Sequence, residues 1–85
     1  MKQYENSLEY LIKSLPIQVE LGLHKDSAHT CNDIAETYLD MNKLSEAKRY
    51  ALKAIDFARG YNLRQERYAY YVLYLIDEKA QNFWS

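Results

Sequence analysis

Residues 31–54 read CNDIAETYLDMNKLSEAKRYALKA. Apolar or small side chains recur at helical spacing in both halves of this stretch, namely Cys31, Ile34, Ala35 and Tyr38, then Ala47, Ala51 and Ala54. Steps of three and four residues place side chains on one face of an α-helix. The stretch therefore predicts two helices, and its small residues allow those helices to approach each other closely.

The flanking residues extend the same periodicity to four helices. The first is expected over residues 4–21, with a kink at Pro16, where a backbone donor is lost, and a left-handed stop at Gly22. The second should run through Met41 from oxygen-bearing caps within residues 25–27.

Two asparagines are expected to mark the remaining helix boundaries. Asn42 can cap a third helix over about 44–60, because its side chain accepts a bond from a free backbone N–H. Asn62 tolerates left-handed backbone geometry and is expected to end that helix. A fourth helix should cover about 64–79, with residues 82–85 beginning another turn.

The composition limits the class of protein. Its 85 residues allow one small domain, and two Gly and one Pro are too few turn signals for an all-β fold. No apolar run approaches 18 residues, which excludes a membrane-spanning helix. A formal net charge of -1 provides no basic footprint for nucleic acid. The single Cys31 excludes an internal disulfide and leaves the compartment open.

The chain also matches itself when it is shifted by forty residues. The pattern Ser7-x3-Leu11-x2-Ser14 lies over Ala47-x3-Ala51-x2-Ala54, with small side chains in both copies at the first and last of these positions. This register predicts the second half of one repeat over about 1–23, a complete repeat over about 24–63 and the first half of a third over about 64–85.

The complete repeat contains Cys31-x2-Ile34-Ala35-x2-Tyr38, followed by Ala47-x3-Ala51-x2-Ala54. This motif resembles the tetratricopeptide repeat, whose pattern is W-x2-L-G-x2-Y, then A-x3-F. Cys31 and Ala51 replace aromatic residues of that pattern, and Glu78 stands where a third unit should show Tyr. Residues 21–26 look like the linker of long variants with roughly forty residues per repeat. The resemblance implies an all-α fold of antiparallel helical hairpins, stacked as a right-handed α-solenoid segment of about two units and four helices.

A stack of four such helices should leave two end faces uncovered, because each hairpin buries its apolar face against its neighbours. Leu8 and Leu11 at one end, and the region of Tyr74, Phe83 and Trp84 at the other, are the candidate uncovered surfaces. We therefore expect a segment of a longer solenoid that, alone, self-associates through its end helices or is marginally stable.

In the resembled family, the first helix of each hairpin lines a concave groove. The exposed positions that match here are His29, Asn32, Asp33, Glu36 and Asp40. The Asn32 amide can both donate to and accept from an extended peptide backbone. The three carboxylates should favour a basic or neutral peptide and repel a terminal carboxylate. A solvated acidic stripe with no ligand is the alternative interpretation of the same residues.

The residues favour no other chemistry. His24, His29 and Cys31 match no zinc spacing, since positions 29 and 31 point about 200° apart on a helix, and no cofactor is expected. The same geometry excludes a Cys31–His29 nucleophile pair. One tyrosine-rich set is expected to pack between hairpins, with a protein interface or a base-stacking platform as alternatives: Tyr61, Tyr68, Tyr70, Tyr71 and Tyr74.

These features predict a protein- or peptide-binding scaffold that performs no reaction. The alternative is a ligand-sensing or regulatory segment of a bacterial signalling protein or transcription regulator, in which binding changes the curvature of the solenoid. An enzyme would instead require a cleft that holds a strongly perturbed carboxylate.

Overall fold

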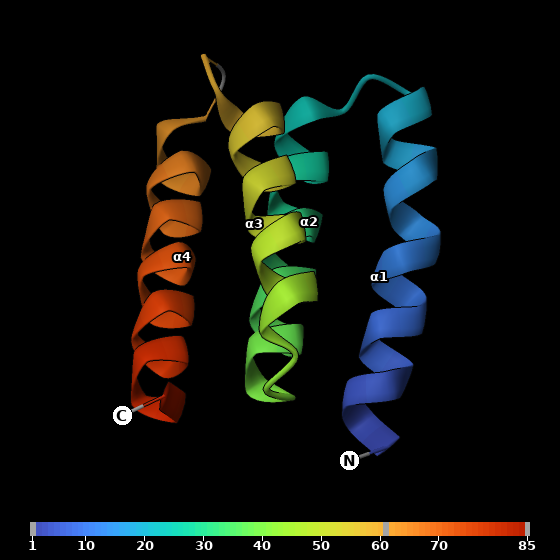
Figure 1. Ribbon diagram of the computed structural model, residues 1–85. Coiled ribbons are helices and arrows are strands. Elements are labelled where there is room, and N and C mark those ends of the chain that lie inside the picture. The colour runs from blue at the N-terminus through green and yellow to red at the C-terminus, as the bar shows by residue number, and fades with distance from the viewer. Residues whose placement is uncertain (1, 61, 85) are drawn as a thin grey trace.

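Four α-helices make up the computed structural model, which describes the backbone of residues 2–60 and 62–84 and the side chains of residues 3–60 and 62–81. They are α1 (Lys2–Glu20), α2 (His24–Asp40), α3 (Leu44–Ala58) and α4 (Leu63–Trp84). Each helix runs antiparallel to the one before it, so both ends of the chain lie at the same end of the molecule (Figure 1). The all-α fold predicted from periodicity is confirmed.

The centre of the molecule is the hairpin of α2 and α3. α3 packs against both α2 and α4, α2 also contacts α1 and α4, and α1 and α4 occupy the outer sides (Figure 1). The buried core residues are Cys31, Ala35 and Leu39 from α2, Ala47, Ala51, Ala54 and Ile55 from α3, and Ala69, Val72 and Ile76 from α4. Among them, Cys31, Ala35, Ala47, Ala51 and Ala54 lie on the helix faces that the sequence predicts to be buried.

The connection after α1 is short because Gly22 turns the chain at once. Gly22 adopts a φ of 74°, in the left-handed region that glycine enters without steric cost. The N–H groups of Gly22 and Leu23 donate to the carbonyls of Val19 and Gln18 at 3.0 and 2.9 Å. Two carbonyls at the end of α1 are thereby satisfied, and the predicted left-handed stop at Gly22 is confirmed.

Asn42 repeats this arrangement after α2, twenty residues later. It adopts a φ of 63°, and the N–H groups of Asn42 and Lys43 donate to the carbonyls of Leu39 and Tyr38, each at 2.9 Å. The prediction that Asn42 caps α3 is therefore wrong. Lys43 occupies the capping position of α3 and forms no side-chain cap.

Asn62 has the role that the sequence assigned to Asn42. Its Oδ1 accepts a hydrogen bond from the Gln65 N–H at 3.4 Å, so Asn62 caps the start of α4. Gly60, with a φ of 82°, takes the left-handed conformation predicted for Asn62. The caps predicted within residues 25–27 are also wrong, because α2 already begins at His24 and has no side-chain cap.

The outer helices differ from the sequence predictions in extent and burial. α1 continues through Pro16 as predicted. α4 runs on to Trp84 without the break predicted after position 79. Leu8, expected on an uncovered end face, is buried. The side chains of Phe83 and Trp84, predicted for the other end face, lie outside the described residues.

The tyrosine-rich segment does not pack as a whole between hairpins. Tyr68 packs against the core, as predicted. Tyr70, Tyr71 and Tyr74 instead remain more than half exposed on α4, so the packing predicted for these three is wrong. The exposure of Tyr74 agrees with the other prediction for this residue, that it lies on an uncovered end face. Tyr61 lies outside the described residues.

Candidate functional site

One side of α2 faces away from α3 and is open to solvent. The exposed or half-exposed side chains there are His29, Asp33, Glu36 and Asp40. α4 lies beside α2 and borders this open face. The structure therefore brings four of the five predicted site residues together, and we call Asp33, Glu36 and Asp40 the acidic row.

Asn32, the fifth predicted residue, is buried rather than exposed. Only 1% of its surface is accessible, and its Nδ2 donates to the Gln65 carbonyl at 3.0 Å and to Gln65 Oε1 at 2.8 Å. These bonds join α2 to α4. Its Oδ1 is buried without a hydrogen-bond partner among the described residues. An unpaired buried acceptor carries a free-energy cost that a ligand donor would remove.

A chain of polar contacts connects Asn32 to the acidic row. Gln65 Nε2 lies 3.1 Å from His29 Nδ1, and His29 Nε2 lies 3.3 Å from an Asp33 carboxylate oxygen. A neutral His29 with its proton on Nε2 fits both contacts, because it accepts from Gln65 and donates to Asp33. The four side chains thus form one connected set of polar contacts.

A pocket of about 300 Å³ opens at this junction of α2 and α4, and we call it the junction pocket. Its lining residues are His29, Asn32, Asp33, Arg64, Gln65 and Tyr68. The sequence prediction included none of the three residues from α4. The forty-residue shift places α4 over α2 and so predicts a neighbouring helix, but it gives no sign of which side chains of α4 reach Asn32.

The carboxylates of the acidic row repel one another. Partial burial raises the pKa of the Glu36 carboxyl above its ordinary value, and the negative charges of Asp40 and Asp33 raise it further. A cation placed against the row would relieve this repulsion and lower the pKa of Glu36 again.

Replacing Glu36 with glutamine is expected to stabilise the protein at neutral pH by about 0.2–0.5 kcal/mol for each like-charge pair removed. The raised pKa in the folded state means that ionised Glu36 destabilises the fold, and this cost disappears as the pH falls through that pKa. Urea denaturation should therefore show a gain at neutral pH that vanishes below a pH of about 4.

Glu9→Gln is the matched control for this measurement. Glu9 accepts a hydrogen bond from Lys13 Nζ at 3.0 Å on the exposed side of α1, so the same substitution removes an attraction. Glu9→Gln should lower the free energy of unfolding slightly. If it instead raised the free energy of unfolding as much as Glu36→Gln does, the assignment of repulsion to the acidic row would be contradicted.

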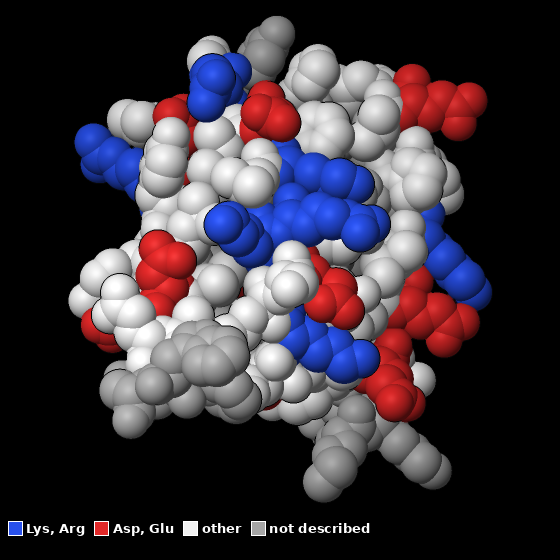
Figure 2. Space-filling model, in the orientation of Figure 1, with Lys and Arg blue, Asp and Glu red and all other residues white. Residues whose placement is uncertain are grey.

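A larger pocket of about 460 Å³ lies on the opposite face, between α1 and α3. Its lining is mostly apolar and comes from Leu15, Pro16, Val19, Glu20, Lys53, Asp56 and Phe57. Figure 2 views this face and shows lysine and arginine side chains gathered across its middle, over α3. The pocket is bordered by two acidic residues, Glu20 and Asp56, and one basic residue, Lys53. Its charges therefore favour neither a cationic nor an anionic ligand.

The described residues contain no group of three or more His, Cys, Asp and Glu side chains that could hold a metal ion. Cys31 is fully buried whereas His29 is exposed, so the two point in different directions, as predicted. Among the described helices, none is both long and apolar enough to cross a membrane.

The hairpin motif, the packing of α3 against α2 and α4, and the open face of α2 agree with one family. A family model for the tetratricopeptide repeat matches residues 1–60. The chain belongs to the tetratricopeptide repeat family. Proteins of this family are protein-interaction scaffolds, and the match covers α1, α2 and α3. Comparisons with curated proteins and with solved structures found no match.

Proposed function

We propose that this tetratricopeptide repeat segment holds an extended peptide of a protein partner on the concave face formed by α2 and α4. The observation that carries the proposal is the unpaired Oδ1 of the buried Asn32 at the junction pocket. An N–H group of an extended peptide backbone is a donor of the right kind for this oxygen. Gln65 accepts hydrogen bonds from Nδ2 of the same amide, which leaves Oδ1 as the acceptor of this side chain without a partner among the described residues.

The charges of the face favour a basic or neutral peptide. The acidic row extends from the junction pocket along α2, and it would attract lysine or arginine side chains of a bound peptide. Arg64 contributes a positive charge to the pocket lining and lies on the α4 side. A peptide with its basic residues over α2 therefore fits better than one that carries a terminal carboxylate.

We propose no catalytic role for this face. Its perturbed carboxyl, Glu36, is exposed, and its shift comes from partial burial and two neighbouring carboxylates. The thiol of Cys31 is buried in the core and lies on another side of α2. The alternative of a ligand-sensing segment in a bacterial regulator stays a prediction.

Reversing the charge of the acidic row is expected to change which peptides bind. On a peptide array, the unaltered chain should prefer lysine- and arginine-rich sequences, and the double variant Asp33→Lys/Glu36→Lys should prefer acidic ones by about tenfold in relative affinity. Both side chains are at least partly exposed, so the substitutions should leave the fold intact.

The matched control is Glu46→Lys/Asp56→Lys. It makes the same change in net charge on exposed positions of α3, the helix on the opposite side of α2. Its peptide preference should equal that of the unaltered chain. An unchanged preference in the Asp33→Lys/Glu36→Lys variant, or equal changes in both variants, would remove the assignment of binding to this face.

A further inference from the structure

The two outer helices carry apolar side chains that the fold leaves in solvent. On α4, Tyr71 and Tyr74 are 54% and 58% exposed, and we call them the tyrosine face. On α1, Tyr10 is 72% exposed and Ile17 is 59% exposed; these two form the outer α1 face. Large apolar residues gathered on one surface are typical of sites that bind another protein.

The packing of α3 against α2 shows how the tyrosine face of one copy can pack against the outer α1 face of another. The forty-residue shift places α1 over α3 and α4 over α2. Cys31 of α2 and Ala54 of α3 belong to the same core cluster, and the residues at the corresponding positions are Tyr71 and Ser14. A large side chain on α4 would thus lie level with a small one on α1, which allows two copies to interdigitate.

The charges at one end of this contact between two copies are also complementary. His24 at the start of α2 and Gly60 after the end of α3 lie at the same end of the hairpin (Figure 1). The shift places Arg64 and Glu20 at these positions, so opposite charges would approach each other. Glu20 borders the pocket between α1 and α3 and is exposed, so a second copy can still reach its carboxylate.

We propose that copies of this chain bind one another end to end, with the outer α1 face of one copy against the tyrosine face of the next, antiparallel as α3 lies on α2. The contact joins two different surfaces, so each added copy presents a new tyrosine face and the stack continues instead of closing as a dimer. The acidic row takes no part in this contact, whereas Arg64 lines the junction pocket as well.

Sedimentation equilibrium of the full chain tests the association itself. A single helix-to-helix contact is smaller than the roughly 1,600 Å² of a standard protein interface, so the association should depend strongly on concentration. The average mass should rise with concentration and pass that of a dimer. A monomer mass at every concentration, or a mass that levels off at a dimer, would overturn the proposal.

Two complementary variants test the pairing of the faces. Tyr71→Arg/Tyr74→Arg places two positive charges on the tyrosine face and leaves the outer α1 face unchanged. Tyr10→Arg/Ile17→Arg places two positive charges on the outer α1 face and leaves the tyrosine face unchanged. Each should be monomeric alone, whereas their mixture should form a 1:1 complex that does not grow. The control Leu52→Arg, at an exposed position of α3, should associate as the unaltered chain does. A monomeric mixture, or a monomeric Leu52→Arg chain, would contradict the pairing.

Circular dichroism will show whether each arginine variant folds. If one does not, disulfide cross-linking between copies tests the same contact. Copies with Ser14→Cys and copies with Tyr71→Cys are mixed and oxidised. The proposal expects disulfide-linked pairs that contain one copy of each kind. If each kind links only to itself, or if no link forms, the geometry is wrong.

Discussion

Replacing Ile34 with alanine is expected to lower the free energy of unfolding by about 2–5 kcal/mol. Ile34 is 0% exposed and has the largest side chain among the residues that the fold buries fully. Removing three carbon atoms there loses hydrophobic transfer energy and leaves a cavity that rigid neighbouring helices cannot close. Urea denaturation followed by circular dichroism measures the change.

Ile17→Ala is the control for this prediction. It makes the same substitution on α1 at a side chain that is 59% exposed, so the change should stay within about 0.5 kcal/mol at low protein concentration. Equal costs at the two positions would show that α2 does not occupy the centre of the fold.

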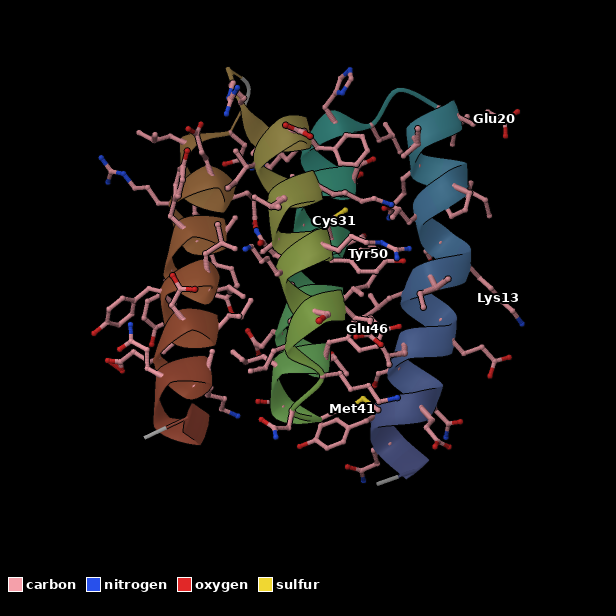
Figure 3. The ribbon with its side chains drawn as sticks, in the orientation of Figure 1. Lys13, Glu20, Cys31, Met41, Glu46 and Tyr50 are labelled. Carbon is pink, nitrogen blue, oxygen red and sulfur yellow. The ribbon has the colours of Figure 1, made fainter. Side chains whose placement is uncertain are left out.

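The Cys31 thiol is expected to react at least about a thousandfold more slowly in the folded chain than in the unfolded one. Burial raises its pKa from 9.0 to about 12, despite a smaller lowering by the positive charge of Lys53. The thiol lies among Ala54, Ile55 and Ala69 in the core between the helices (Figure 3). Since only the thiolate attacks, both the raised pKa and the lack of access slow the reaction.

Reaction with a chromogenic disulfide reagent, with and without denaturant, measures this ratio. A Cys31→Ala/Ser45→Cys variant is the control, because position 45 is exposed at the start of α3 and its thiol should react fast in both conditions. Equal rates for Cys31 with and without denaturant would contradict the buried position of this residue.

The sequence predicts the helices well because their periodicity is strong. The spacing of Cys31, Ala35, Ala47 and Ala51 depends only on the 3.6-residue turn of a helix, and these residues are buried as predicted. Burial of Leu8 was harder to predict, because it depends on how α1 is rotated against α2. Sequence spacing on α1 alone does not determine that rotation.

The roles of Asn42 and Asn62 show where local reasoning fails. Asparagine favours both helix caps and left-handed turns, so residue type alone does not choose between them. Position 42 needs the left-handed turn because α3 starts two residues later, at Leu44. Gly60 already supplies that turn after α3, and Asn62 is therefore free to cap α4.

The candidate site was predictable on α2 and not on α4. The acidic row follows from three carboxylates on one helix face, which the sequence displays directly. The bond between Asn32 and Gln65 joins residues 33 positions apart, and it depends on the rotation of α4 against α2. For the same reason the sequence showed neither the burial of Asn32 nor the participation of Tyr68.

Nuclear magnetic resonance with the isotopically labelled chain tests the binding face most directly. The chain is titrated with the basic peptide that binds best on the array, and shifts of the backbone amides are followed. Binding on the concave face predicts the largest changes at His29, Asn32, Gln65 and Tyr68, with little change along the outward side of α3. Changes confined to α1 and the outward side of α3, or no change with any basic peptide, would contradict the proposed site.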